Sequence, residues 1–155
     1  MRAMRVVLQR VSRASVEIGG ETVGRIGTGL LLLISIEKGD GDKEIAFMAD
    51  KILNLRIFAD GADKMNLSIQ EIKGEILSIS QFTLASRIKK GRRPDFTNAE
   101  EPGRAEELYS RFNALLAAAV PVATGIFGSL MDVHSVNHGP VTFILEKTSD
   151  DLKPS

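Results

Sequence analysis

The run from Ser78 to Leu84 gathers the side chains in this sequence that are best suited to build a reaction site. It holds two serines, a glutamine, a phenylalanine and a threonine in seven residues. Polar groups at the end of an apolar strand often form a binding site. A threonine hydroxyl is a poor nucleophile without a neighbouring base, and the sequence around Thr83 supplies none. On spacing alone, a polar-edged strand with Ser80 and Phe82 on one face and Gln81 on the other explains the run better.

A second stretch is dense in positive charge. Five cations fall within seven residues, although the whole chain has 20 basic and 20 acidic residues and no formal net charge. Like charges this close repel one another unless an anion lies nearby or solvent screens them. The phosphate backbone of a nucleic acid is the natural anion, and a solvated surface loop is an equally good alternative. The five residues are Arg87, Lys89, Lys90, Arg92 and Arg93.

A third stretch, residues 137–142, reads Asn-His-Gly-Pro-Val-Thr. A Gly-Pro pair between two apolar segments is ordinarily a turn. About 5–6% of X-Pro bonds in folded proteins are cis, and the local sequence does not decide the isomer of Gly139-Pro140. His134 and His138 are four residues apart, which along a strand is about 13 Å, so they lie too far apart to chelate one metal ion.

The composition excludes several kinds of site. The chain has no cysteine, which rules out disulfides, thiolate metal sites and cysteine nucleophiles, and its two histidines are too few for a histidine-built metal centre. The segment Gly24–Gly29 lacks the spacing of a dinucleotide loop and is typical of a hairpin turn. Neither a P-loop nor a nucleophile elbow is present. We therefore expect neither a metal nor a cofactor.

The length and the hydrophobicity indicate one globular domain. A chain of 155 residues that is 43% hydrophobic and 26% charged can bury a core of its own. The N-terminal segment lacks a signal-type apolar core, and the longest apolar run, Leu30–Ile34, is too short to cross a bilayer. These features predict a cytoplasmic protein. The sequence leaves open whether Met1 or Met4 is the natural start.

The elements that must position these residues form a single mixed-sheet α/β domain over residues 1–147, followed by a polar tail at 148–155. Three strands joined by glycine turns should form a meander, a fourth should span 75–84, and two C-terminal strands should flank a turn at Gly139-Pro140. The meander strands are predicted at 5–18, 21–26 and 30–36, and the last two strands at 131–137 and 141–146.

Two helices are predicted from apolar residues at three- and four-residue spacing. The first should begin at a cap formed by Asp42 and end near Leu55. The second should have Pro102 in its first turn and stop at Pro121. Between the fourth strand and the second helix, Arg87–Pro102 is the longest irregular stretch, and loops of this length are often functional.

Two of these stretches together resemble the paired signature of the D-aminoacyl-tRNA deacylases, a family once called D-tyrosyl-tRNA deacylases. The signature combines Ser80-Gln81-Phe82-Thr83-Leu84 with Asn137-x-Gly139-Pro140-Val141-Thr142. Other segments agree in order and spacing, so that the resemblance covers roughly residues 4 to 146. They are Gln9-Arg10-Val11, Lys64-Met65-Asn66-Leu67, Gly91-Arg92-Arg93-Pro94-x-Phe96, Arg104-Ala105-x-x-Leu108-Tyr109 and Thr124-Gly125-x-Phe127-Gly128-x-x-Met131-x-Val133.

The resemblance implies a homodimeric hydrolase that cleaves the ester between a D-amino acid and the terminal ribose of tRNA. Glycine mischarged on tRNA is an implied further substrate, and no cofactor is implied. The Gly139-Pro140 bond would be cis and would reach into the pocket of the partner subunit. There its backbone carbonyls would meet the substrate's α-amino group, and an L side chain would be directed into the main chain. Such a selector reads handedness whatever the side chain is.

The resemblance also implies roles for individual residues. Arg10 would brace the Gly-Pro segment with its guanidinium fork, next to Asn137. Thr83 is either a nucleophile or only part of the pocket wall, and we favour catalysis by positioning, with an oxyanion donor among the backbone amides near Phe82. The pocket for the aminoacyl-adenosine end would be lined by Ser80, Gln81, Phe82 and Thr83. Acceptor-stem phosphates would be held by Lys89, Lys90, Arg92 and Arg93.

The sequence departs from the family pattern at three places. His138 stands where the family often has an acidic or small polar residue, Ser135 replaces a more apolar residue, and Asp95 replaces a small polar one. An aspartate beside Arg93 should weaken the phosphate patch slightly. Two alternative functions stay open. One is a related deacylase of L-alanine mischarged on tRNA, with a trans Gly-Pro bond, and the other is a non-catalytic RNA-binding homologue.

Overall fold

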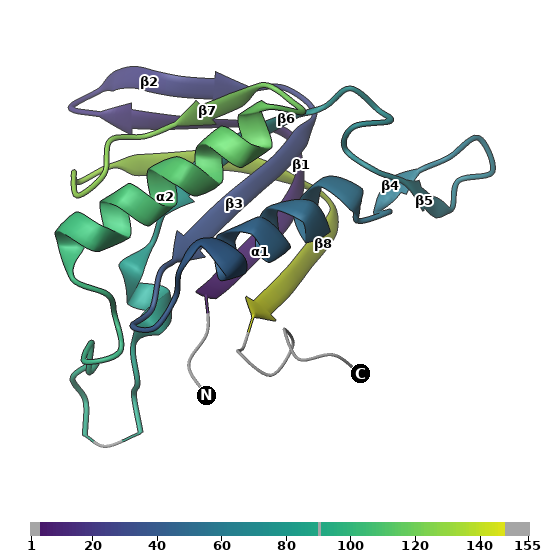
Figure 1. The fold of residues 1–155 in the computed structure, drawn as a ribbon. Coiled ribbons are helices and arrows are strands. Elements are labelled where there is room, and N and C mark those ends of the chain that lie inside the picture. Colours follow the sequence, from purple (N-terminus) through teal and green to yellow (C-terminus); the bar gives the residue numbers. More distant parts are fainter. Residues whose placement is uncertain (1–3, 90, 148–155) are drawn as a thin grey trace, which may run out of the picture.

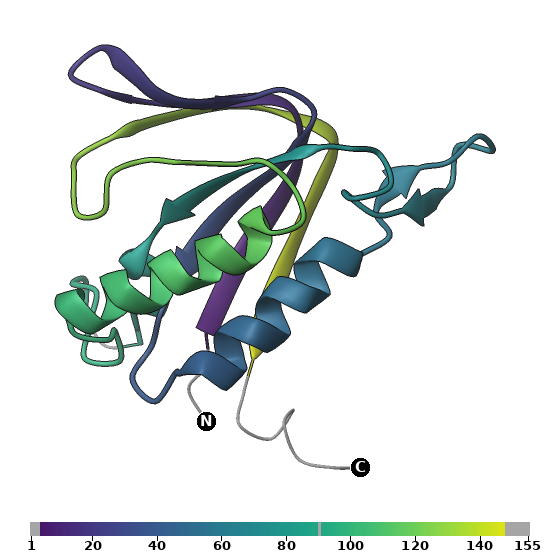
Figure 2. The same cartoon turned by 45° about the horizontal axis from the view of Figure 1, so that its top comes forward.

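Two long antiparallel strands, β1 (Met4–Ile18) and β8 (Asp132–Lys147), run through the whole fold. The structure is a computed structural model, and it describes residues 4–89 and 91–147. Buried residues alternate with partly exposed ones along the first half of β1, because one face of the strand packs on the core. Both strands bend sharply near their middle (Figure 1 and Figure 2).

The two strands that follow β1 pair with it one after the other. β2 (Glu21–Ile26) pairs with the second half of β1 and β3 (Gly29–Ser35) with its first half, so the sheet order is β2-β1-β3-β6-β7, with β8 also paired to β1. The predicted meander, in which each strand would pair with the next, is therefore wrong. β3 lies beside β1 because the 15 residues of β1 offer an edge long enough for two shorter strands.

Beyond β3 the sheet becomes parallel. β6 (Glu75–Ser80) pairs in parallel with β3, and β7 (Val122–Thr124) pairs in parallel with β6. Parallel neighbours need a crossover, which α1 (Asp42–Asn54) and α2 (Pro102–Ala117) provide. Both helices cover the same side of the sheet (Figure 2). The predicted mixed α/β domain with two helices is confirmed.

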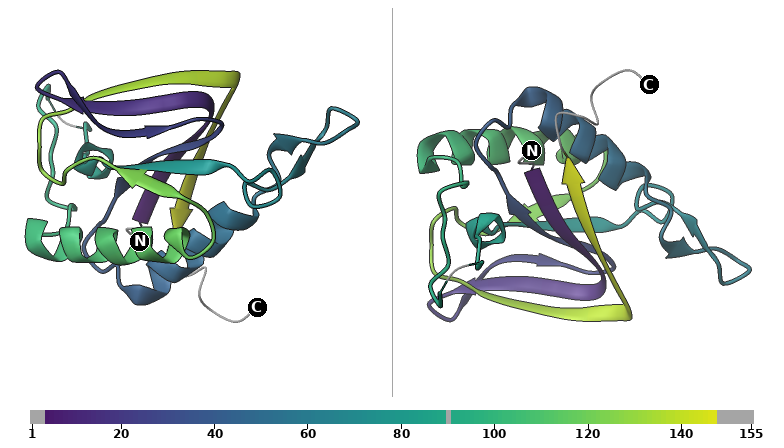
Figure 3. Two further views of the ribbon diagram at one scale, coloured as in Figure 1. Left: turned by 90° about the horizontal axis from the view of Figure 1, so that it is seen from above. Right: turned by 90° about the horizontal axis from the view of Figure 1, so that it is seen from below.

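The core has two parts on opposite faces of the sheet. On β3, Leu30 and Leu32 pack toward the helices, while Leu31 between them belongs to the other cluster. That second cluster includes Val16 of β1 and Ile79 of β6. The bend of β1 therefore folds its second half, together with β2, over the face of the sheet that the helices leave open (Figure 3).

Two element boundaries differ from the prediction. β6 ends at Ser80 rather than continuing to residue 84, and a short 3-10 helix, η1 (Phe82–Ala85), follows it. The cap of α1 is Gly41 rather than Asp42, because the carboxylate of Glu44 accepts a hydrogen bond from the Gly41 amide at 2.8 Å. Neither change could be seen from hydrophobic spacing, since both depend on backbone hydrogen bonds.

A short hairpin follows α1. It consists of β4 (Phe58–Ala59) and β5 (Met65–Leu67) and extends away from the rest of the domain (Figure 3). One Asp60 carboxylate oxygen accepts hydrogen bonds from the amides of Ala62 and Lys64, which closes the connecting turn.

The Gly139-Pro140 pair does not reverse the chain, so the predicted turn between two strands is wrong. Gln9 pairs with Thr142 and Val11 with Asn137, and both flanks of the pair run along β1 in the same direction. Between these two pairings β8 has more residues than β1, and the extra residues leave the ladder as a bulge. The two predicted strands are one strand, and we call residues 138–140 the Gly-Pro bulge.

Within residues 4–89 and 91–147, the structure contains no helix with the length and hydrophobicity needed to span a membrane. The predicted polar tail at 148–155 and the cation Lys90 lie outside the described residues.

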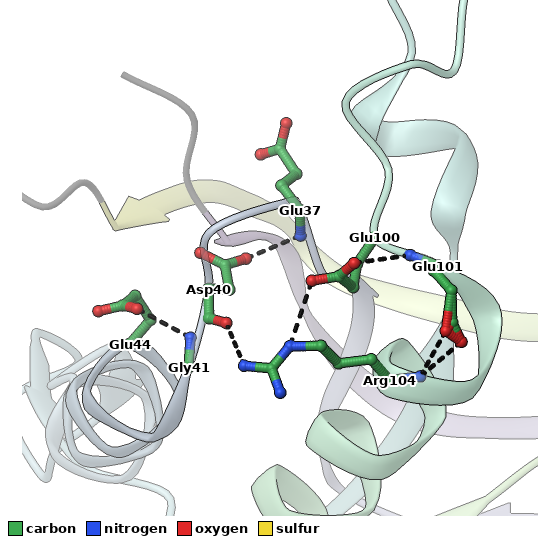
Figure 4. A network of polar contacts seen from close by, with 7 residues as sticks. All are labelled: Glu37, Asp40, Gly41, Glu44, Glu100, Glu101 and Arg104. Carbon is green, nitrogen blue, oxygen red and sulfur yellow. Dashed lines mark hydrogen bonds and ion pairs between the residues drawn. The ribbon is translucent and has the colours of Figure 1, made fainter.

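A buried carboxylate joins three segments of the chain at one end of the sheet. Asp40 accepts hydrogen bonds from the backbone amides of Met4 at 3.1 Å and Glu37 at 2.8 Å. From α2, Arg104 donates to the Asp40 carbonyl at 3.2 Å and forms an ion pair with Glu100 at 3.3 Å (Figure 4). The network fixes the loop after β3 against the segment that leads into α2.

This network predicts a pH-dependent stability. Burial raises the pKa of Asp40 from 3.8 to about 7, and the carboxylates of Glu37 and Glu44 add to the shift that the two backbone amides oppose. Between pH 3.8 and about 7 the folded protein therefore binds more protons than the unfolded chain, so stability falls as the pH rises. From pH 5.5 to pH 8 the contribution of Asp40 should fall by about 2 kcal/mol. Thermal melts of wild type and Asp40→Asn at both pH values test this, and a Tm difference that does not change with pH would contradict it.

Candidate active site

A cleft of about 780 Å³ lies where the three parallel strands β3, β6 and β7 end. Ligands of open α/β sheets bind at the carboxyl ends of the strands. The first turn of α2 and the connection from β7 to β8 complete the walls. Most of the lining is apolar, with a few polar groups among it, including Lys38, Ser80, Gln81, Glu100 and Glu101.

The Ser-Gln-Phe-Thr run, residues 80–83, begins at the last residue of β6. The Gln81 amide donates to the Ile34 carbonyl at 2.7 Å, and the chain then turns into η1. Ser80, Gln81 and Phe82 line the cleft, whereas Thr83 is exposed but does not border it. The predicted alternation of Ser80 and Phe82 with Gln81 on opposite faces is wrong, because the run is helical from Phe82 onward.

Thr83 has no base beside it among the described residues. The group at its hydroxyl is the Gln81 side-chain amide, which donates a 2.6 Å hydrogen bond and is not basic. The two carboxylates that border the cleft are already engaged. Glu101 caps α2 by accepting the Arg104 amide at 3.1 Å, and Glu100 accepts the Glu101 amide at 2.8 Å besides its ion pair with Arg104. Thr83 therefore lacks the partner that an activated hydroxyl needs.

Aromatic rings form two sides of the cleft. Phe82 is 58% exposed and lies against Phe96, with 5.1 Å between the ring centroids. On another wall lies Phe127, whose ring centroid is 6.0 Å from that of Tyr109. Exposed aromatic faces stack readily on nucleobases, which also have a flat π surface.

Hydrogen bonds of Tyr109 and its neighbours hold α2 against β6 beside the cleft. The Tyr109 hydroxyl donates to the Ser78 carbonyl at 2.6 Å, and the Ser78 hydroxyl donates to the side-chain oxygen of Asn113 at 2.6 Å. Burial raises the pKa of Tyr109, so the phenol stays protonated and keeps its donor at neutral pH. These bonds tie α2 to β6 just before the Ser-Gln-Phe-Thr run begins.

The Gly-Pro bulge is held from two sides. Arg10 donates from Nε to the His138 carbonyl at 2.9 Å and from a terminal nitrogen to the Ile57 carbonyl at 2.7 Å. Across the base of the bulge, Asn137 accepts the Val141 amide at 2.7 Å and donates to the Thr142 hydroxyl at 3.0 Å. The Gly139-Pro140 peptide bond is cis, and both residues are exposed.

Within one chain the bulge and the cleft are separate. None of the four residues Arg10, Asn137, Gly139 and Pro140 lines the cleft. Arg10 pairs with Leu30 of β3 and Ser80 with Ile34, so about 13 Å of strand separates the two positions. A single chain does not bring the two predicted halves of the site together.

The basic loop lies between η1 and α2 and is closed by paired hydrogen bonds of 2.8 Å between the backbones of Arg87 and Asp95. Lys89, Arg92 and Arg93 are exposed on it. The Thr97 amide donates to the Asp95 carboxylate and lowers its pKa, so this acid stays ionised. The loop leads directly into Phe96 and the cleft wall.

Sequence reasoning missed several residues that line the cleft. Phe96, Phe127 and Met131 belong to segments that carried the resemblance, but no role was predicted for them. The available signal was their aromatic or apolar type, together with the place of Phe96 in the long irregular stretch. No cluster of three or more histidine, aspartate or glutamate side chains is placed to hold a metal ion in the part of the chain that the structure describes.

Comparison with known proteins places this geometry in a family. The family model described as D-Tyr-tRNA(Tyr) deacylase matches residues 7–146. The chain belongs to this family. A D-aminoacyl-tRNA deacylase of Geobacter sulfurreducens is 53% identical over 147 residues, which are 94% of this chain and 97% of the relative. One of Bacillus licheniformis is 52% identical over 144 residues, or 92% of this chain and 98% of the relative. The predicted family, which is a family of enzymes, is confirmed.

Solved structures in the same comparison share the fold of this deacylase family member. The structure of a c-Myc DNA Unwinding Element Binding Protein is 42% identical, has a TM-score of 0.89 and covers 94% of this chain and 99% of its own. A structure described as a probable eukaryotic D-amino acid tRNA deacylase has a TM-score of 0.80, covers 94% of this chain and 100% of its own and, at 20% identity, shows the fold alone.

Proposed function

We propose that this member of the deacylase family hydrolyses the ester of D-aminoacyl-tRNA to a free amino acid and tRNA, and also removes glycine mischarged on tRNA. The main structural support for the proposal is the cleft at the ends of the parallel strands. Its volume of about 780 Å³ lies within the rough range of 300–1,000 Å³ for small-molecule sites. Its aromatic walls suit the terminal adenosine, and its polar run from Ser80 suits the ester. The enzyme would act in the cytoplasm and would need no cofactor.

The active site would form between two copies of the chain. β8 pairs only with β1 among the described strands, so its second half, residues 141–147, is an edge with backbone groups available to a partner. Large apolar side chains are exposed on this strand and next to the cleft, including Ile144 at 65% and Leu130 at 94%. A twofold homodimer that buries these groups would let each chain place its Gly-Pro bulge in the cleft of the other.

The bulge would select the D enantiomer by its main chain. The carbonyls of Gly139 and Pro140 would accept hydrogen bonds from the substrate's α-amino group, and an L side chain would then collide with the same backbone. The fork of Arg10 on one side and the Asn137 side chain on the other support a rigid bulge, which such a filter requires.

Hydrolysis would rely on positioning. Water adds to the ester carbonyl carbon, a tetrahedral oxyanion forms, and the ribose oxygen leaves as a hydroxyl, while the neighbouring ribose hydroxyl helps to activate the water. The first amides of a helix have no acceptor within it, so the N–H groups of Phe82 and Thr83 at the start of η1 are the proposed oxyanion donors.

Thr83→Ala should retain most of the deacylase activity, within about threefold of wild type, because the hydroxyl has no base and the backbone amide remains. Single-turnover hydrolysis of D-tyrosyl-tRNA measures this. Mass spectrometry of the quenched wild-type reaction provides the decisive control, since an acyl group trapped on Thr83 would contradict the positioning mechanism.

The basic loop is proposed to hold acceptor-stem phosphates through Lys89, Lys90, Arg92 and Arg93. Lys89→Gln combined with Arg93→Gln should weaken tRNA binding and reduce the slope of log K against log salt by about two. Binding of tRNA across a salt series measures the slope. If the slope is the same as that of wild type, the loop does not contact phosphate.

The proposed activity competes with a second candidate, a non-catalytic nucleic-acid-binding protein, because one similar structure is named as a DNA-element-binding protein. Incubation with tRNA charged with D-tyrosine, L-tyrosine or L-alanine separates the possibilities. The proposal predicts release of D-tyrosine alone. Release of nothing despite tRNA binding would favour the binding protein, and release of L-alanine would favour the related deacylase.

A further inference from the structure

A second cavity, of about 580 Å³, lies over β2, β1 and β8, and its lining combines basic and hydroxyl side chains with apolar ones. Arg25 of β2 and His134 of β8 both lie directly opposite Ser15 of β1. Residues directly opposite on neighbouring strands project from the same face of a sheet. Arg13 is two residues from Ser15 along β1 and so shares that face. We call this site the basic cavity.

The two arginines of the basic cavity carry charge that the protein itself does not neutralise. Neither the Arg13 nor the Arg25 side chain forms a hydrogen bond or ion pair with any residue in the described ranges, and both residues are exposed. Two acids share this face: Glu17 lies 3.5 Å from His134, and Asp132 lies directly opposite Glu17 on β8. On a sheet, the backbone positions of diagonal neighbours such as Arg13 and Arg25 are roughly 7–8 Å apart, so both guanidinium groups can reach one anion.

The basic cavity adjoins the cleft, because Val133 of β8 lines both. It is also distinct from the basic loop. In Figure 1 and Figure 2, β2 lies at one end of the molecule and the loop between η1 and α2 lies at the other. A polyanion whose end occupies the cleft could therefore reach two separate groups of cations.

We infer that the basic cavity binds phosphodiester groups of the single-stranded end of tRNA, next to the terminal adenosine in the cleft. The inference rests on the proposed function. Guanidinium groups hold phosphate oxygens in a two-pronged geometry, and the Ser15 hydroxyl adds a donor between the arginines. Contacts of this kind fix the position of the RNA without reading its sequence.

The test is tRNA binding by the full chain with Arg13→Gln and Arg25→Gln together. The dissociation constant for uncharged tRNA should rise about tenfold, and the slope of its salt dependence should fall by about two. Arg25→Gln alone, on an exposed hairpin, should lower the slope by about one. Lys43→Gln with Lys73→Gln removes the same charge from exposed positions away from the cavity and serves as the matched control.

Two further measurements make the outcomes distinct. Hydrolysis of a D-aminoacyl ester of adenosine, which lacks the neighbouring phosphates, should be the same in the arginine variant and in wild type. Unchanged tRNA affinity and salt slope in the arginine variants would overturn the inference even if deacylation of D-aminoacyl-tRNA is normal. If wild type fails to deacylate any substrate while tRNA binding still depends on Arg13 and Arg25, the proposed activity fails and the basic cavity stands.

Discussion

Gly139→Ala is expected to lower the rate of D-aminoacyl-tRNA hydrolysis by about a hundredfold, because small displacements of positioning groups cost about that much. Gly139 has a φ of +148°, a region that side chains with a Cβ rarely adopt. An added Cβ would lie 2.8 Å from the Val141 amide nitrogen, 2.6 Å from a Val141 methyl and 3.3 Å from Arg10. The bulge must therefore shift, and its carbonyls would leave the position that we propose for binding the substrate's amino group.

Steady-state kinetics with D- and L-tyrosyl-tRNA measure the effect of Gly139→Ala, and the ratio of the two rates should fall together with the D rate. Gly61→Ala is the matched control, since a Cβ at Gly61 meets no atom within 4 Å. The bulge is exposed, so the variant should fold, as circular dichroism can verify. Normal D-specific activity in a folded Gly139→Ala protein would exclude the bulge as the chiral filter.

Phe82→Ala is expected to weaken productive binding of the substrate by about tenfold to a hundredfold. A base stacked on an aromatic side chain contributes about 1–3 kcal/mol, and the exposed ring of Phe82 beside Phe96 is the platform that we propose for the terminal adenine. Because Phe82 is 58% exposed, its removal should change Tm little. The loss should appear in kcat/KM for D-aminoacyl-tRNA.

Phe82→Tyr keeps the ring and should retain the activity that Phe82→Ala loses. Leu115→Ala, which truncates another exposed apolar side chain on the outer side of α2, should have no effect on kcat/KM. If the alanine variant at position 82 has the kinetics of wild type, the adenine does not stack there and the cleft must hold another part of the substrate.

Local patterns in the sequence located most of the elements and the polar run. Apolar spacing placed both helices within a few residues, since each helix buries one continuous stripe. The Ser80–Phe82 segment was placed at the end of a buried strand, and the structure adds that this strand ends in a cleft. These features could be predicted because they depend on neighbours within one or two turns of chain.

Features that depend on distant segments could not be predicted. Whether Gly139-Pro140 makes a turn or a bulge depends on whether its flanks pair with each other or with a third strand, and both flanks pair with β1. Phe96 meets Phe82 only after the basic loop closes. The pKa of Asp40 is raised only when three segments bury it. The resemblance supplied the roles that spacing alone could not.

Mixed dimers test most directly whether one chain's bulge serves the other chain's cleft. Gly139→Ala chains keep an intact cleft, and Phe82→Ala chains keep an intact bulge. When the two are unfolded together and refolded in equal amounts, half of the dimers should be mixed, and each mixed dimer has one intact site of two. The account predicts recovery of about a quarter of the wild-type activity. Activity no higher than the average of the two separate variants would contradict it.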